Sequence, residues 1–323
     1  MAKMKKERNW WKLIAIDLII VLLAMVGLKS CSSKMSNAQS VPENYTSKVE
    51  TGGALEAKYL AMGTHETSYV EYGALMSFEK YEIYYPSDMD KISTPLPVVV
   101  FVNGTGVPGS KYQALQKHMA SWGFITIATE EDYAWNGFSA EMSVRFLKML
   151  NETNGEYYGK ENIFYGKIDT DNIGITGHSQ GGYGVINAIT DQRNKDSYKA
   201  SVILSSAPSL KNNDFLWDAD SSKISTPTMF ISTTGQFDQI VASLPLLTEE
   251  YNKISNDVDK VLMRQNSGDH GDMLYTGDGY VTAWFMYYLQ GDAEAKDAFF
   301  GANAEINNNS KYQDILVNQS ENN

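Results

Sequence analysis

The feature that most constrains the fold is the segment 172–184, in which a short apolar strand runs into Gly-His-Ser-Gln-Gly at 177–181 and then into an amphipathic helical pattern. A Gly-x-Ser-x-Gly spacing between a strand and a helix predicts a tight turn with a strained serine backbone. The positions two before and two after Ser179 must then be glycine, because a Cβ there would collide with the adjoining strand or helix. The pattern predicts a nucleophilic serine at the carboxyl end of a strand.

Strand and helix patterns alternate on both sides of this motif. Continuous runs rich in β-branched residues predict buried strands at 97–102, 124–128, 200–204, 228–232 and 258–263, and helical spacing predicts helices at 112–122 and 140–150. This alternation predicts an α/β protein with a mostly parallel central sheet and helices on both faces. Residues 205–227 are too few to form a large cap domain, so we expect an open site.

A serine hydroxyl is a weak nucleophile that needs a histidine to accept its proton and a carboxylate to orient that histidine. In the α/β-hydrolase fold the acid and then the histidine follow the serine along the chain. Of the four histidines, only His270 follows Ser179. Asp238 leaves the preceding predicted strand, whereas Asp269 adjoins His270 too closely for the usual geometry. We therefore predict a catalytic triad of Ser179, Asp238 and His270.

Other segments at the same edge of the sheet are expected to complete the site. The glycine-rich turn 103–106 follows a buried strand, and in such a turn a backbone N–H is free to bind an oxyanion. Tyr133 and Trp135 follow the next strand, where they either line a substrate cleft or cover the rim of the core. His178, beside the nucleophile, is a third candidate for substrate contact.

With these residues in place, the segment 80–303 resembles the cutinase and poly(ethylene terephthalate) hydrolase group, in the dienelactone-hydrolase-like branch of the α/β-hydrolases. The similar motifs are Gly-His-Ser-Gln-Gly-Gly at 177–182, Val-Asn-Gly-Thr at 102–105, Asp-Gln-Ile at 238–240 and Ser-Gly-Asp-His at 267–270. The resemblance implies Ser179 as nucleophile, His270 as base and Asp238 as the orienting acid. It also implies an oxyanion hole formed by the backbone N–H groups of Thr105 and Gln180.

Two features of that group are missing from this sequence. The segment 204–208 lacks the tryptophan that members active on polyesters carry after this strand, and the only cysteine, Cys31, cannot form an intramolecular disulfide. We therefore expect a serine hydrolase that cleaves small or polymeric carboxylic esters through an acyl-enzyme, as carboxylesterases, lipases and cutinases do. Whether it cleaves polyesters stays open.

The alternatives are a peptidase or acyltransferase with the same triad, and a surface lipoprotein without catalytic activity. The predicted chemistry needs no cofactor. Four scattered histidines and one cysteine offer no cluster of metal ligands, so no metal is expected. The formal net charge of −12 argues against nucleic acid or an anionic membrane surface as the partner of the folded part.

The N-terminus has a different composition. Five Lys and Arg residues within 1–12 precede the run 13–28, which is apolar except for Asp17. The residues that follow resemble the lipobox of bacterial lipoproteins, with Cys31 as the lipidated residue, and the alternative is an uncleaved signal anchor.

These patterns divide the chain into three parts. We expect residues 1–30 to form a signal peptide or membrane anchor and the polar segment 31–50 to form a flexible tether. Residues 51–323 would form the catalytic domain. The sequence thus predicts a monomer at the extracellular face of a bacterial cytoplasmic membrane, attached only through its N-terminal segment or released from it.

Overall fold

The computed structural model describes residues 41–157, 159–208 and 217–320. The predicted signal segment, Cys31 and the first ten residues of the predicted tether lie outside these ranges. Within the described ranges, every helix is too short or too polar to span a membrane.

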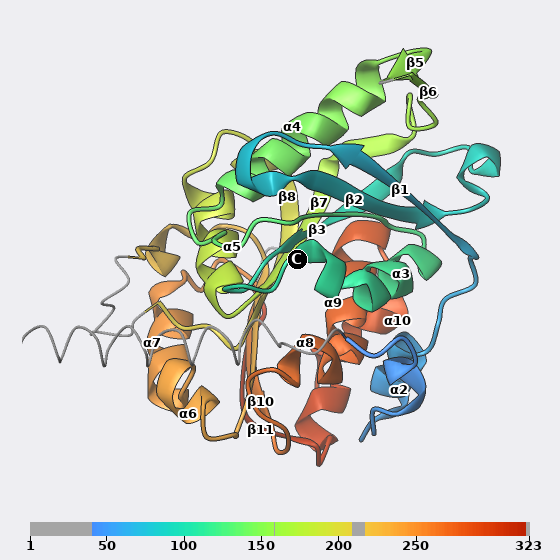
Figure 1. The fold of residues 1–323 in the computed structure, drawn as a ribbon. Coiled ribbons are helices and arrows are strands. Elements are labelled where there is room, and N and C mark those ends of the chain that lie inside the picture. The colour runs from blue at the N-terminus through green and yellow to red at the C-terminus, as the bar shows by residue number, and fades with distance from the viewer. Residues whose placement is uncertain (1–40, 158, 209–216, 321–323) are drawn as a thin grey trace, which may run out of the picture. The chain divides into compact units, whose positions relative to one another are not determined.

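Nine strands form the central sheet, in the spatial order β1-β2-β4-β3-β7-β8-β9-β10-β11 (Figure 1). They are β1 (Thr67–Gly73), β2 (Lys80–Pro86), β3 (Leu96–Val102), β4 (Ile125–Thr129), β7 (Ile168–His178), β8 (Tyr198–Leu204), β9 (Thr228–Thr233), β10 (Lys260–Gln265) and β11 (Tyr312–Asn318). The strands from β4 to β10 in this order are parallel, whereas β1 and β2 at one edge and β11 at the other are antiparallel. A separate short hairpin joins β5 (Glu156–Tyr157) to β6 (Lys160–Glu161).

Helices cover both faces of this sheet (Figure 1). One face carries α3 (Gln113–Ser121) and α9 (Asp278–Gln290), with α2 (Ala54–Leu60) and α10 (Ala293–Lys296) packed on α9. The other carries α4 (Phe138–Glu152), α5 (Gln180–Thr190) and α7 (Leu244–Lys253). The short helices α6 (Asp238–Val241) and α8 (Met273–Thr276) follow β9 and β10. The predicted α/β-hydrolase architecture is therefore confirmed.

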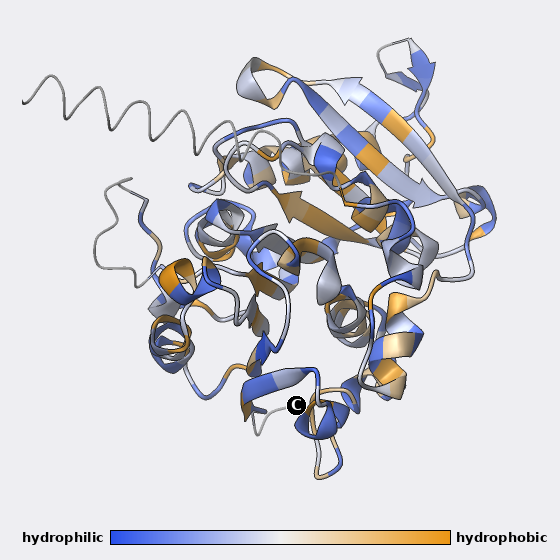
Figure 2. Ribbon diagram, turned by 60° about the horizontal axis from the view of Figure 1, so that its bottom comes forward, coloured by the Kyte–Doolittle hydropathy of each residue, from blue (hydrophilic) through white to orange (hydrophobic). Residues whose placement is uncertain are grey.

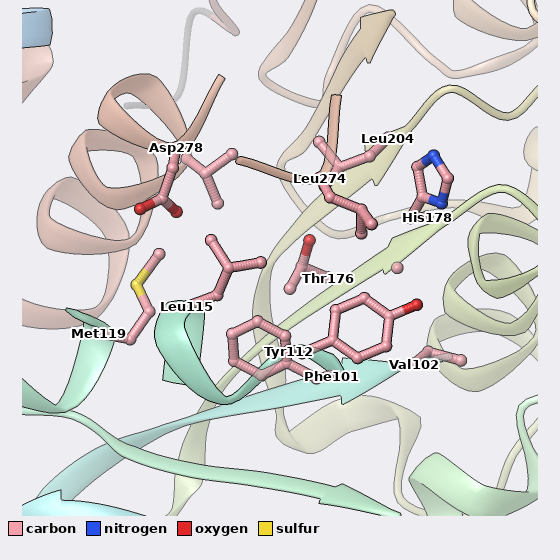
Figure 3. A pocket seen from close by; sticks show the side chains of 12 residues that line it. Phe101, Val102, Tyr112, Leu115, Met119, Thr176, His178, Leu204, Leu274 and Asp278 are labelled. Carbon is pink, nitrogen blue, oxygen red and sulfur yellow. The ribbon is translucent and has the colours of Figure 1, made fainter. Parts of the chain in front are cut away.

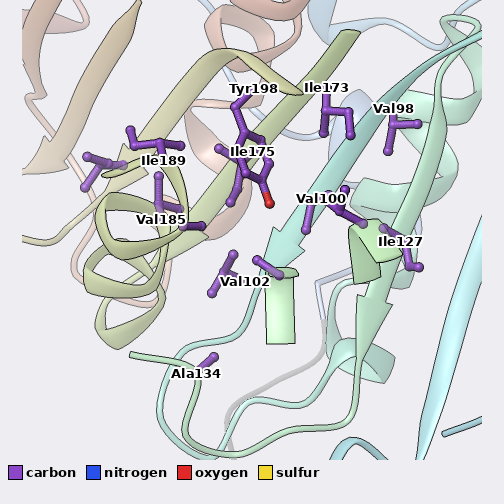
Figure 4. Close-up of a cluster of buried hydrophobic side chains, with 14 of the residues drawn as sticks. Val98, Val100, Val102, Ile127, Ala134, Ile173, Ile175, Val185, Ile189 and Tyr198 are labelled. Atoms are coloured by element: carbon purple, nitrogen blue, oxygen red, sulfur yellow. The ribbon is translucent and has the colours of Figure 1, made fainter. Parts of the chain in front are cut away.

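The core lies between the parallel strands and their covering helices. Every residue of β3 is buried, because helices pack on both faces of this strand, as its continuous apolar run predicts. On one face, side chains of β3 and β7 pack against Val185 and Ile189 of α5 (Figure 4). Figure 2 shows the hydrophobic residues gathered in the strands of the interior. This packing fixes the strand ends from which the site residues project.

The sequence pattern predicts that residues 41–50 belong to a flexible tether. In the structure, these residues pack on the domain instead. Val41 is buried and Tyr45 is only 1% exposed. The Tyr45 ring packs edge-on against His118 of α3, and its hydroxyl donates a hydrogen bond to Asp278 of α9. A few scattered apolar residues within a polar segment produce no recognisable pattern, which is why the folded domain begins earlier than the sequence predicts.

Candidate active site

Ser179 stands between β7 and α5 in the strained turn that the sequence predicts. Its φ of 57° is unusual for a residue other than glycine. A Cβ on Gly177 would lie 2.4 Å from the carbonyl oxygen of Gly181, and one on Gly181 would lie 2.2 Å from that of Val102. Only glycine fits at both positions, so the chain can turn sharply and present the serine at the carboxyl end of the sheet.

His270 and Asp238 meet at the same edge of the sheet. Asp238 is the first residue of α6, and His270 lies in the loop between β10 and α8. The Nδ1 atom of His270 is 2.7 Å from Oδ1 of Asp238, which is fully buried. Since an ionised carboxylate can only accept hydrogen bonds, Nδ1 carries a proton and Nε2 is the nitrogen left to act as a base.

A set of donors that the sequence did not point to holds the other oxygen of Asp238. The hydroxyl of Ser205 donates to Oδ2 at 2.6 Å, and Thr233 donates from its backbone N–H at 2.7 Å and from its hydroxyl at 2.8 Å. Burial raises the pKa of Asp238, but His270 and these donors outweigh it and lower the pKa below its ordinary value. The carboxylate therefore stays ionised beside His270. The positive φ of Ser205, at the end of β8, was not visible as a sequence signal.

Asp269, which adjoins His270 in sequence, ties the two loops together. Its Oδ1 accepts hydrogen bonds from the backbone N–H groups of His270 at 2.8 Å and Phe237 at 3.1 Å. The loops also approach so closely that a Cβ on Gly235 would lie 2.4 Å from Oδ1 of Asp269. The loop that carries the acid and the loop that carries the histidine are thus joined through one carboxylate.

The Nε2 atom of His270 is buried and has no hydrogen-bond partner in the described part of the chain. Ser179 is half-buried, and no hydrogen bond joins its hydroxyl to His270 among the described residues. Hydrogen bonds between a nucleophile and its base are often long in the absence of substrate and shorten in the complex. The geometry leaves this nitrogen available for a proton.

Two backbone N–H groups beside Ser179 have no acceptor among the described residues. They belong to Thr105 and to Gln180, the first residue of α5. By contrast, the N–H of Gly104 donates to the Tyr112 hydroxyl at 2.9 Å, and that of Gly106 donates to the carbonyl of Asp132 at 3.2 Å. The two N–H groups predicted for the oxyanion hole are therefore free to bind an oxyanion.

The three candidates for substrate contact lie in different surroundings. Tyr133 is 62% exposed, and the next residue, Ala134, donates its N–H to the side chain of Gln180, which holds this segment of the backbone close to the Ser179 turn. Trp135 is half-buried and faces a surface hollow shared with Asn187 of α5, and no residue of the predicted triad lines that hollow. His178 is buried beneath the His270 loop, with its Nε2 atom bonded to the carbonyl of His270.

A second buried histidine–aspartate pair lies away from Ser179, between α3 and α9. Nδ1 of His118 is 2.7 Å from Oδ2 of Asp278, and its Nε2 is 2.9 Å from the carbonyl oxygen of Ala61. Burial lowers the pKa of His118, but Asp278 and the backbone acceptors outweigh it and raise the pKa. The ion pair with Asp278 and the raised pKa both favour the protonated form of this histidine.

Comparison with protein families places the chain. The sequence model of the PET hydrolase-like family, PETase, matches residues 47–315. The chain belongs to the PET hydrolase-like family. A comparison with curated proteins found no match.

Membership in the PET hydrolase-like family agrees with the resemblance to cutinases, and it supports ester hydrolysis as the chemistry of this site. Among the described residues, no three His, Cys, Asp or Glu side chains are grouped so as to hold a metal ion. The groups gathered at this edge of the sheet are a hydroxyl, an imidazole with one open nitrogen, a buried carboxylate and two open N–H groups. This set can transfer an acyl group.

Proposed function

We propose that this chain is an exported serine hydrolase that cleaves carboxylic esters through an acyl-enzyme intermediate. The observation that carries the proposal is the 2.7 Å contact of His270 Nδ1 with buried Asp238, beside a serine in a strained strand-to-helix turn. Membership in the PET hydrolase-like family supports the same chemistry. The basic and apolar N-terminus and the position of Cys31 support export, and Cys31 is the proposed lipidation site.

In the proposed reaction, His270 Nε2 takes the proton of the Ser179 hydroxyl while the oxygen attacks the ester carbonyl. The N–H groups of Thr105 and Gln180 bind the oxyanion, aided by the positive end of the α5 dipole. Collapse of the tetrahedral intermediate breaks the ester bond as His270 gives its proton to the leaving alkoxide. Water then attacks the acyl-enzyme in the same way and releases the acid.

Asp238 has two roles in this scheme. It holds His270 with Nε2 toward the serine, and its charge stabilises the imidazolium that forms when Nε2 takes the proton. The donors from Ser205 and Thr233 keep the carboxylate ionised without sharing the oxygen that faces His270. No cofactor takes part in these steps.

The proposed substrates are small or polymeric esters that reach an open site. Tyr133 is 62% exposed and Phe237, which packs edge-on against the His270 ring, is 43% exposed. Exposed aromatic side chains suit the apolar part of an ester. Hydrolysis assays on small soluble esters and on a film of poly(ethylene terephthalate), run side by side, would show whether this chain cleaves the polyester for which the family is named.

Replacement of the nucleophile tests the proposal. We expect Ser179→Ala to lose hydrolysis of short p-nitrophenyl esters and labelling by a fluorophosphonate probe, with a melting temperature close to that of the wild type. Ser222→Ala, which removes an exposed hydroxyl bonded to Asp220, is the matched control and should keep both activities. Retained turnover in Ser179→Ala would remove the assignment, and cleavage of peptides without cleavage of esters would favour a peptidase.

A further inference from the structure

A small pocket lies beneath the Ser179 turn, between the sheet and helices α3, α8 and α9. Its volume is about 20 Å³, and every residue that lines it is buried. Most of the lining is apolar, but Tyr112, Thr176, His178 and Asp278 also face it. Figure 3 shows His178 and Asp278 at opposite ends of this pocket, with Thr176 between them. The pocket therefore touches the underside of the candidate active site.

His178 connects this pocket to the catalytic loop. Its Nε2 atom lies 2.6 Å from the backbone carbonyl oxygen of His270, and the two rings lie 4.4 Å apart between centroids. A carbonyl oxygen can only accept a hydrogen bond, so Nε2 of His178 must carry the proton. In a neutral imidazole the other nitrogen, Nδ1, is then an acceptor.

The pocket offers Nδ1 of His178 a polar environment without a direct protein partner. Nδ1 of His178 and the hydroxyl oxygen of Thr176 are both buried and have no hydrogen-bond partner among the described residues. The two side chains lie on the same face of β7 because they are two residues apart. Tyr112 accepts the N–H of Gly104, which leaves its own hydroxyl proton for another acceptor.

The size of the pocket indicates what can satisfy these atoms. A buried water needs on the order of 10–15 Å³ of space and two to four polar partners. The pocket provides about 20 Å³ together with an imidazole nitrogen and two hydroxyl groups. We therefore infer that one water occupies the pocket, where it would donate to Nδ1 of His178 and bond to the hydroxyl of Thr176 or Tyr112.

We propose that His178 is a positioning residue for His270, whose carbonyl it holds through Nε2–H while a water bound in the pocket donates to Nδ1. This inference rests on the proposed role of His270 as the base. It assigns His178 to the support of the catalytic loop instead of to substrate contact. The side chain is 5% exposed, and its only N–H is already bound to the loop.

A neutral side chain suits this position for an electrostatic reason. Burial and the neighbouring His270 lower the pKa of His178 to about 3, so the ring is uncharged at neutral pH. A cation here would repel the imidazolium that forms on His270 during the reaction and would slow proton transfer. A neutral His178 can therefore hold the carbonyl of His270 without repelling the positive charge that forms on the His270 ring.

Two substitutions separate positioning from packing and from substrate contact. His178→Leu removes the donor, and we expect kcat for a p-nitrophenyl ester to fall about 10- to 100-fold with little change in KM, since small displacements of a catalytic group cost this much. His178→Gln places an amide N–H at similar reach and should restore most of kcat. Unchanged kcat in His178→Leu, a loss seen only in KM, or equal losses in both variants would overturn the proposal.

The tautomer can be observed without any turnover. The chain has only four histidines, so ¹⁵N spectra of histidine-labelled protein are simple, and the signals missing from His178→Gln identify this ring. We expect His178 to stay neutral with its proton on Nε2 between about pH 5 and pH 9, in the wild type and in Ser179→Ala. A proton on Nδ1, or titration in this range, would contradict the proposal even if esterase activity is present.

Thr176→Val tests the bound water, because valine keeps the shape of threonine and removes the hydroxyl. We expect a smaller loss of kcat than in His178→Leu, together with a shift of the His178 Nδ1 signal. If both stay unchanged, the pocket water has no part in holding His178. If the wild type neither turns over esters nor reacts with the fluorophosphonate probe, the proposed function fails while the spectra still decide the contact between His178 and His270.

Discussion

Two regions of this molecule bury a histidine against an aspartate, and they differ in what faces the second ring nitrogen. In the candidate site, His270 lies 2.7 Å from Asp238, and in the core His118 lies at the same distance from Asp278. Nε2 of His118 is bonded to the carbonyl of Ala61, whereas Nε2 of His270 has no partner among the described residues. In the core pair the Nε2 atom is occupied, and in the candidate site it is open.

The contrast teaches that a short histidine–aspartate contact does not identify a base. A histidine whose Nδ1 faces an aspartate and whose Nε2 is bonded to a carbonyl has no nitrogen free to accept the proton of a nucleophile. His118 can therefore only join α3 to α9 and to the segment that carries Tyr45. His270 keeps one nitrogen free, and this nitrogen lies on the side of the sheet where Ser179 emerges.

The largest expected effect is on kcat, which should depend on Asp238 and not on Asp278. Asp238→Asn should lower kcat on a p-nitrophenyl ester by about 10³- to 10⁴-fold, because an amide does not hold the imidazole in the tautomer that leaves Nε2 free. Asp278→Asn should keep kcat close to the wild-type value. Steady-state kinetics on both purified variants provides the comparison, and equal losses would mean that the two pairs are not functionally distinct.

The next expected effect concerns the stability of the fold, for which the core pair of His118 and Asp278 matters most. Asp278→Asn leaves His118 buried without its counter-charge, and breaking a buried pair in this way costs about 3–5 kcal/mol of unfolding free energy. Glu71→Gln, which weakens the exposed pair with Lys80, is the control and should cost less than about 1 kcal/mol. Urea unfolding measures both values. A loss of the same size in the two variants would show that the core pair does not stabilise the fold.

A smaller effect on kcat is expected from the loss of a side chain that donates a hydrogen bond to Asp238. Ser205→Ala removes one donor to Oδ2 of Asp238, and a hydrogen bond to a charged group of this kind corresponds to about tenfold in kcat. Ser201→Ala, in the strand β8 that precedes Ser205, removes a hydroxyl that bonds to Thr228 and not to the acid. We expect this second variant to keep its kcat, so a similar fall in both would point to a general disturbance of β8.

The finest test uses pH. The pKa of His118 is raised in the folded protein, so its contribution to stability is complete below the unfolded value of about 6.5 and is lost as pH rises through the raised folded value. The difference in unfolding free energy between the wild type and His118→Gln should therefore shrink as the pH rises above about 6.5. A difference that stays constant or grows with pH would contradict a charged His118.

The sequence predicted the parts of this molecule that depend on local pattern. The parallel strands were visible as apolar runs, and the turn at Ser179 as a fixed spacing of glycines. His270 followed from chain order, since it is the only histidine after Ser179. The strands and the turn are local features of the sequence, and His270 is one of only four histidines, so few alternatives had to be excluded.

Features that depend on contacts between distant residues could not be predicted. Ser205 lies 33 residues before Asp238 in the sequence, and His178 lies 92 residues before His270. Tyr45 is separated from Asp278 by 233 residues, which is why the segment 41–50 was expected to be a tether. The edge strand β11 was not predicted, and it pairs antiparallel with β10. No spacing or periodicity in the chain marks such pairs.

The single carboxylate of Asp269, bonded to the backbones of Phe237 and His270, limits how this enzyme can diverge. Insertions or deletions in either loop would shift the acid and the histidine together, so changes of loop length are poor routes to a new specificity. Exposed side chains that leave this linkage intact, such as Phe237 and Ile240, are better starting points for altering which esters are accepted. Directed evolution of this scaffold should therefore accumulate point substitutions there sooner than changes in loop length.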